Sequence, residues 1–148
     1  MIAPQLEDTD FKLTHDDDWT LFTAENGVKL YQSPTKDIWE FVEGEFAGEQ
    51  KFTWDAAMRE TKKAGKEIPE DWSVYTNDSD FPEKLGLRKS GIYNRSGTTY
   101  NHGTLGYYWS SVFDGTHAFG ISFKSGTEVC EAGGKSFTAG FSVRCLKQ

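Results

Sequence analysis

The sequence predicts a single domain of the α+β class, in which a helix-bearing middle section precedes a C-terminal half of short strands and loops. The chain has 148 residues, which suits one domain with its own hydrophobic core. Its aromatic content is 15%, with five Trp and eleven Phe, so a modest number of aliphatic residues still makes a core. Fifteen glycines indicate many turns between short elements.

The chain begins with an acidic segment, residues 1–20, that contains three consecutive aspartates. A run of like charges is usually solvated, so we expect a loose arm or an edge segment there. Phe11, Leu13 and Trp19 are the side chains that would dock this arm. The remaining residues, 21–148, are expected to form the single domain.

Three short strands are expected after the arm, over residues 20–24, 28–32 and 38–42. Each mixes apolar and polar positions, and an Asn-Gly pair at 26–27 gives the hairpin signature between the first two. Residues 44–50 are then expected to form a loop.

The clearest helix signal begins at Thr53, whose hydroxyl suits the N-cap, and ends at Gly65, which suits the left-handed C-terminal position. Helical spacing directs one face toward the core, namely Trp54, Ala57, Met58, Thr61 and Ala64. Shorter helical turns are expected at 69–72 and 82–86, and none after Leu87.

Charge and motifs exclude several classes of function. The net charge is −7, and residues 1–90 carry 11 Lys and Arg against 20 Asp and Glu, which argues against binding to nucleic acid. No apolar run approaches the roughly 20 residues of a membrane span, and the first residues do not read as a signal peptide. No His-x-x-x-His, Cys-x-x-Cys or Gly-x-Ser-x-Gly element is present, so we predict no catalytic residue, no metal and no cofactor. Cys130 and Cys145 fit either two reduced, buried thiols or one disulfide.

An ordered series of motifs resembles a C-type-lectin-like domain, and it lies at residues 52–58, 85–87, 91–94, 106–111, 118–123 and 140–145. The strongest are Gly-Tyr-Tyr-Trp-Ser-Ser at 106–111 and Gly-Phe-Ser-Val-Arg-Cys at 140–145. The version it resembles most is the major paralogous domain first noted in Fibrobacter succinogenes, which also serves as the variable protein of diversity-generating retroelements. The resemblance covers about residues 36–148. It implies a C-type lectin-like fold, with two short helices around small twisted antiparallel sheets with long loops.

The chain departs from that family in three respects. The Gly-Trp-Arg-Leu-Pro-Thr element after the first helix is weakened to Gly-Lys-Glu-Ile-Pro-Glu at 65–70. The Glu-Pro-Asn and Trp-Asn-Asp calcium motifs of sugar-binding lectins are absent, so the resemblance does not imply calcium-dependent sugar binding. The fold is shared with formylglycine-generating enzymes, but nothing matches their active-site cysteine pattern.

The resemblance implies a ligand-display protein, in which a frame of buried rings holds a variable surface within residues 93–124. The partner would be a protein or glycan receptor on another cell or surface, and the protein would lie on a virion or a cell surface. The alternatives are a bacterial surface adhesin or lipoprotein domain, a structural virion subunit that binds its own copies, and, by analogy alone, an enzyme.

Candidate surface residues follow from loop chemistry and from alternation along the strand at 118–124. Alternation directs Phe119, Ile121 and Phe123 to the core, and Gly120, Ser122 and Lys124 to the ligand. We expect Trp109 to be buried with its indole N–H bonded within the frame. Tyr and Asn in Gly-rich loops suit ligand contact, and an exposed Phe113 would be a binding hot spot. The full set is Tyr93, Asn94, Tyr100, Asn101, His102, Tyr107, Phe113, Asp114, Thr116, His117, Gly120, Ser122 and Lys124.

Overall fold

Small antiparallel sheets and two short α-helices build the fold, which belongs to the α+β class as predicted. A computed structural model describes residues 4–7, 11–77, 80–94, 97–124, 129–135 and 138–147, with the main chain alone for 129–135. The elements in order are β1 (Thr20–Thr23), β2 (Lys29–Gln32), β3 (Ile38–Phe41), β4 (Gln50–Phe52), α1 (Trp54–Lys63), the 3-10 helix η1 (Trp72–Tyr75), α2 (Phe81–Lys84), β5 (Ile92–Tyr93), β6 (Thr99–Tyr100), β7 (Gly106–Phe113), β8 (Ala118–Phe123) and β9 (Val129–Lys135).

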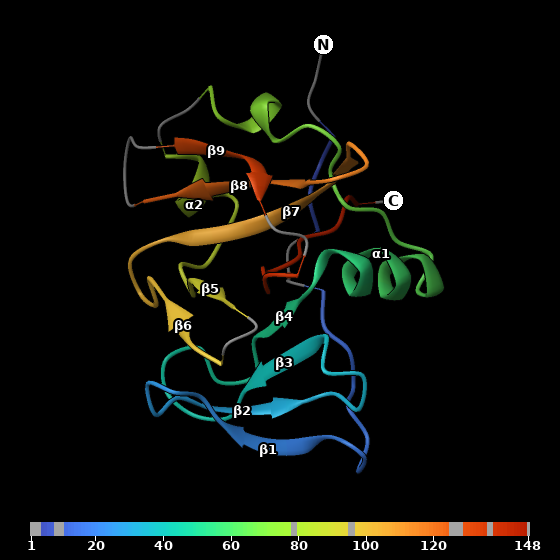
Figure 1. Ribbon diagram of the computed structural model, residues 1–148. Coiled ribbons are helices and arrows are strands. Elements are labelled where there is room, and N and C mark those ends of the chain that lie inside the picture. Colours follow the sequence, from blue (N-terminus) through green and yellow to red (C-terminus); the bar gives the residue numbers. More distant parts are fainter. Residues whose placement is uncertain are drawn as a thin grey trace.

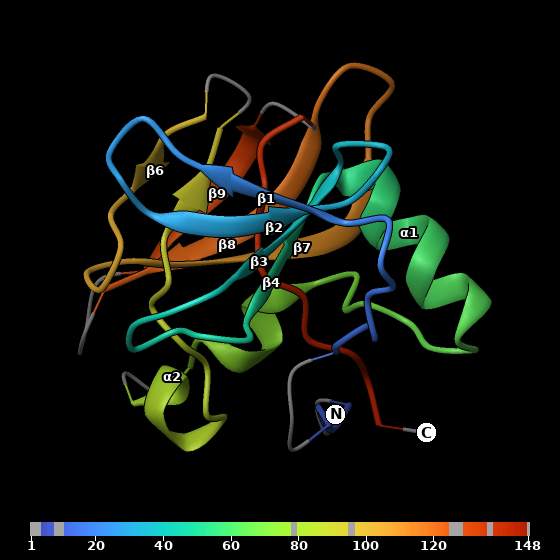
Figure 2. The ribbon, with the colours of Figure 1, turned by 90° about the horizontal axis from the view of Figure 1, so that it is seen from below.

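The strands form three sheets in which neighbours along the chain pair with one another. The orders are β1-β2-β3-β4, β5-β6 and β7-β8-β9. Figure 1 shows the four-stranded sheet at one end of the molecule and the three-stranded sheet at the other, with β5 and β6 between them. Figure 2, turned by 90°, shows α1 and α2 again on opposite sides of the body.

The C-terminal segment 138–147 links all three sheets and the N-terminal arm. Its bridges are Phe52 with Phe141, Tyr93 with Gly140, Tyr108 with Ser142, and Leu6 with Leu146. The interior of the molecule is therefore assembled around a segment that pairs through isolated bridges and not as a regular strand. This segment contains the Gly-Phe-Ser-Val-Arg-Cys motif.

Stacked aromatic rings fill the space between the two larger sheets. Trp109 and Phe141 lie 3.9 Å apart between ring centroids and nearly parallel, at 14°. Trp109 is fully buried, and its indole N–H donates to the carbonyl of Phe52 at 2.7 Å, which confirms the predicted role of Trp109. Of the two cysteines, Cys145 is buried in this central cluster, and the side chain of Cys130 lies outside the described residues.

The described part of the acidic arm is docked and not loose, and the three side chains that were expected to dock it, Phe11, Leu13 and Trp19, all lie in or against the central cluster. Phe11 is buried in the central cluster. The Gln50 side chain exchanges two hydrogen bonds with the main chain of Leu13, at 2.8 and 2.7 Å. His15 lies 2.8 Å from the carboxylate of Glu40. The apolar residues of the arm outweigh its charges because each meets a partner far along the chain.

Local signals located the first elements well. The three predicted strands agree with β1, β2 and β3 to within one residue at each end. Thr53 caps α1, and Gly65 follows the helix at φ +70°. Ala64 is exposed and not in the core as predicted, since it caps the free end of the helix. The turn expected at 69–72 is displaced to η1, because the Asp71 side chain caps Ser73 and starts the helix there.

Candidate binding surface

Eight of the thirteen predicted surface residues form two groups at opposite ends of β7, and all of the eight except the half-buried Asn94 are exposed. The loop surface, Asn94, Tyr100, Asn101 and His102, belongs to the β5–β6 hairpin and the loop before β7. The tip surface, Phe113, Asp114, Thr116 and His117, together with Trp54 of α1, surrounds the β7–β8 turn. An eight-residue strand spans roughly 25 Å, so the two groups do not make one patch. Figure 1 shows β6 and the β7–β8 turn at the two ends of the strand.

Four residues that were predicted to face a ligand are buried or half-buried, so the sequence prediction was wrong for them. Tyr107 and Ser122 are each only 8% exposed, and Tyr93 is also buried. The C-terminal segment covers their side of the sheet, since the Phe141 ring lies 5.2 Å from the Tyr107 ring. Gly120 is half-buried, and a Cβ there would come within 3.1 Å of Phe141.

The opposite face of β8 is covered as well. Ile121 and Phe123 are buried against Trp72 and Phe81, as the predicted core face requires. Phe119 belongs to that face but is half-buried and lines a pocket. Alternation therefore divided the residues of β8 correctly between two faces, but only the packing of the structure shows that both faces are covered. Lys124, just beyond β8, is exposed as predicted.

The loop surface is held in place by contacts to the body. Asn101 adopts a left-handed conformation at φ +58°, and its amide nitrogen donates to the Tyr107 hydroxyl at 3.0 Å. The His102 ring packs on Phe41 and Phe46, at 5.2 and 4.7 Å between centroids. Burial, and then the charge of a neighbouring lysine, hold the pKa of His102 below 6.5. Tyr100 remains exposed at the strand end.

The tip surface presents a ring on a rigid turn. The Asp114 carboxylate accepts from the amides of Thr116 at 2.9 Å and His117 at 2.7 Å, and these bonds lower the pKa of Asp114. Phe113 is 39% exposed and stacks on Trp54, with centroids 4.9 Å apart at 22°. The Trp54 indole N–H donates to the carbonyl of Ser110 at 2.9 Å, so the ring on which Phe113 stacks is itself held in place.

Trp54 was assigned to the core by helical spacing, and it does pack half-buried against the central cluster, but its contact with the exposed Phe113 was not predicted. The available signal was its position as the first residue of α1, where a side chain reaches past the body of the helix. Trp72 and Phe119, which line the adjacent pocket, were also missed. The sequence offered one hint for Trp72, since Pro69 and Trp72 follow the first helix where the family that the chain resembles carries a Pro and a Trp.

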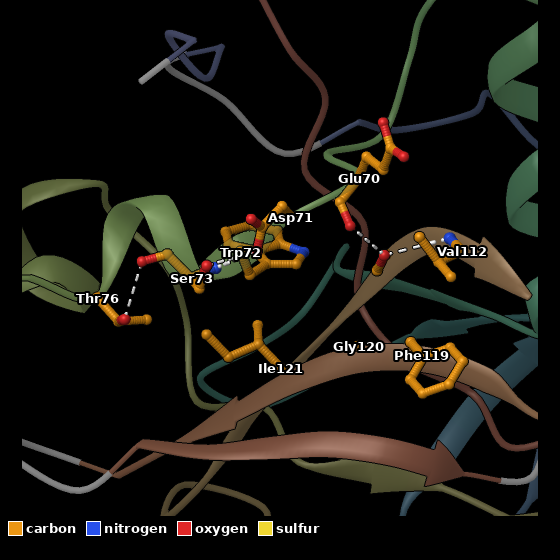
Figure 3. A pocket seen from close by; sticks show the side chains of 10 residues that line it. Glu70, Asp71, Trp72, Ser73, Thr76, Val112, Phe119, Gly120 and Ile121 are labelled. Carbon is orange, nitrogen blue, oxygen red and sulfur yellow. Dashed lines mark hydrogen bonds between the residues drawn. The ribbon is translucent and has the colours of Figure 1, made fainter. Parts of the chain in front are cut away.

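A pocket of about 290 Å³ opens beside the tip surface, between η1 and the outer face of β8. It is lined by Glu70, Asp71, Trp72, Ser73, Thr76, Ser110, Val112, Phe119, Gly120 and Ile121. In Figure 3, Phe119 and Ile121 lie on the strand, and Trp72 and Ser73 of η1 lie across from them with Asp71, the residue that caps η1. Val112 immediately precedes Phe113, so the pocket and the tip surface are continuous along the chain.

Comparisons with protein-family models, with curated proteins and with solved structures give no match. Within the described part of the chain, no three His, Cys, Asp or Glu side chains gather where they could hold a metal ion. None of the helices in that part has the length and hydrophobicity needed to cross a bilayer.

Proposed function

We propose that this chain is a ligand-binding domain of the C-type lectin-like kind, which recognises a protein or glycan partner through the tip surface. The observation that carries the proposal is the exposed ring of Phe113, which is stacked on Trp54 above a hydrogen-bonded turn. The placement of the motifs supports it. The Tyr-Trp-Ser-Ser motif lies on β7 and the Gly-Phe-Ser-Val-Arg-Cys motif in the linking C-terminal segment, so the frame is buried and the connections are exposed.

The physical case rests on preorganisation. Binding orders side chains at a cost of about 0.5–1.5 kcal/mol for each mobile one. Phe113 is already held against Trp54, and the turn that follows is already closed by Asp114. A partner therefore gains contact with an aromatic ring without ordering it first. Residues of this kind are the ones that dominate binding energy.

The test is a binding screen with matched variants. The wild-type domain is applied to a printed glycan array and to a display library of extracellular protein domains. Phe113→Ala should weaken capture of a true ligand by about 30-fold, which corresponds to about 2 kcal/mol. Leu21→Ala is the control, because Leu21 is 55% exposed but lies on β1 in another sheet, and it should leave capture unchanged.

Stability separates a binding role from a structural one. Loss of the Phe113–Trp54 stack should cost about 0.5–1.5 kcal/mol of unfolding free energy, well below the 3–5 kcal/mol typical of a core Phe. Capture that survives Phe113→Ala but is lost with Tyr100→Ala would move the site to the loop surface. An assembly mass that rises with concentration, and falls in Phe113→Ala, would assign the ring to contacts between copies of the chain.

We further propose that the chain is the variable protein of a diversity-generating retroelement. The test is to sequence its locus. A near-copy of the codons for about residues 93–145, beside a reverse transcriptase gene and differing mainly at adenines, is the expected result. Differences should fall on exposed positions such as Phe113 and Asp114 and should spare the buried Tyr107 and Ser122. A locus without a near-copy or a reverse transcriptase would contradict the proposal.

A further inference from the structure

The pocket beside η1 owes its shape to hydrogen bonds that hold residues 69–72 against the bulged part of β7. The amide of Ser111 donates to the carbonyl of Pro69 at 3.0 Å, and the Ser110 hydroxyl donates to the carbonyl of Glu70 at 2.8 Å. The indole N–H of Trp72 donates to the carbonyl of Trp109 at 3.1 Å. The β7–β8 pairing is irregular over the same stretch. The walls are therefore built by fixed contacts on both sides.

The side-chain donors of the pocket are already used. The Ser73 hydroxyl donates to the Asp71 carboxylate at 2.6 Å, and the Thr76 hydroxyl donates to the carbonyl of Ser73 at 3.0 Å. Together with Ser110 and Trp72, this accounts for the hydroxyl and indole protons among the lining residues. A ligand that presents only acceptors, such as a carboxylate or a phosphate, finds no unused side-chain donor among the described lining residues.

Acceptors and negative charge remain at the rim. Glu70 and Asp71 are both exposed, and none of the ten described lining residues is a Lys, Arg or His. Hydrogen bonds from Ser73 lower the pKa of Asp71, so its carboxylate is ionised at neutral pH. Glu70 also lines the hollow under α1, together with Lys62 and Lys66, whereas Asp71 lines only the pocket beside η1. The pocket beside η1 thus combines an apolar floor with an acidic edge.

We infer that this pocket takes an apolar side chain of a protein partner whose neighbouring residue is Lys or Arg, with Asp71 receiving the cation. A volume of about 290 Å³ lies just below the range of small-molecule sites, which begins at about 300 Å³, and suits one side chain. A sugar needs donors as well as acceptors and an open ring face, whereas Trp72 is buried. The inference rests on the proposed binding function and narrows its partner to a protein.

The test uses two matched peptides, acetyl-Gly-Phe-Lys-Gly-amide and acetyl-Gly-Phe-Glu-Gly-amide, titrated into the isotope-labelled chain. NMR follows the indole N–H of Trp72 and the amides of Ser73 and Gly120. The Lys peptide should shift these signals in the millimolar range, and the Glu peptide should bind at least about fivefold more weakly. Asp71→Ser, which removes the charge and keeps a hydroxyl to cap η1, should weaken the Lys peptide about two- to fivefold, whereas Glu83→Gln, an exposed acid of α2 outside the pocket, should not.

Several results would overturn the inference. These are equal binding of the two peptides, shifts that map away from the pocket, or no shift at the solubility limit. The outcome is separable from the proposed function, because capture of a screened ligand is judged with Phe113→Ala. If neither peptide binds in the pocket but capture of a screened ligand still requires Phe113, the inference about the pocket is rejected and the proposed role of the tip surface stands.

Discussion

A buried ionic network beneath β4 gives the sharpest prediction for stability. Lys51 is 1% exposed, and its ammonium donates to the Ser90 hydroxyl and to the carbonyl of Gly91, both at 2.7 Å. Glu49 is 6% exposed, and its Oε1 accepts from the hydroxyls of Ser90 at 2.6 Å and Ser142 at 2.9 Å. The two charges therefore meet through the shared hydroxyl groups of Ser90 and Ser142, which lie far along the chain from both of them.

The magnitude follows from the cost of leaving one charge buried alone. Removal of one partner of a buried ion pair typically costs 3–5 kcal/mol. Lys51→Met should cost about 3 kcal/mol, at the low end, because Arg88 still lies 3.5 Å from Glu49. Glu49→Gln should cost about 4 kcal/mol, since it leaves the ammonium enclosed. The double variant should cost about 4 kcal/mol in total, because both charges leave the interior together.

The assay is urea unfolding followed by tryptophan fluorescence, at one pH and one salt concentration. Lys63→Met is the control, because Lys63 is exposed and should change the unfolding free energy by less than about 0.5 kcal/mol. Strict additivity in the double variant would show that the two side chains do not interact. A cost below about 1 kcal/mol for Lys51→Met would refute the reasoning as a whole.

Three further predictions concern titration and backbone geometry. Burial raises the pKa of Tyr93 to about 12, so the folded state favours its neutral form. This contribution to the unfolding free energy should be complete below about pH 10 and lost between about pH 10 and 12. Tyrosinate absorbance and denaturation, both followed against pH, would test it. The pKa of His102 is lowered by burial, so the folded state favours the neutral imidazole. Its contribution to stability should be present above pH 6.5 and be lost as the pH falls. A titration midpoint of His102 at or above pH 6.5, measured by NMR in the folded protein, would contradict this. In Gly91→Ala the new Cβ would overlap the carbonyl oxygen of Tyr100, whereas in Gly44→Ala it meets nothing within 4 Å. Both glycines have positive φ, so Gly44→Ala should cost about 1–2 kcal/mol of unfolding free energy and Gly91→Ala clearly more. Equal melting temperatures of the two variants would contradict this.

Near-neighbour signals explain which elements could be predicted. An Asn-Gly turn, a Thr53 cap and a Gly65 terminus act over a few residues, so the first hairpin and α1 agree with expectation. The exposure of Phe113 also follows from its place next to a turn. In contrast, Lys51 lies in a stretch that reads as polar, and its burial depends on residues about 40 and 90 positions away.

The predicted ligand-facing side of β8 shows why the site could not be completed from the sequence. Ser122 and Gly120 do share a face, as alternation requires. That face is covered by Phe141, and the opposite face by Trp72 and the segment around it. Alternation reports that two faces differ, but the covering segments come from elsewhere in the chain.

Composition and short-range pattern alone established the α+β class, the aromatic core, the early strands and helix, and Phe113 as a candidate surface residue. Tertiary packing decided that the arm docks, that Tyr107 and Ser122 are enclosed, and that the exposed candidates divide between the two ends of β7. The reason is physical: local conformation follows from steric and hydrogen-bonding preferences of adjacent residues, whereas exposure depends on which distant segments come to lie on a surface.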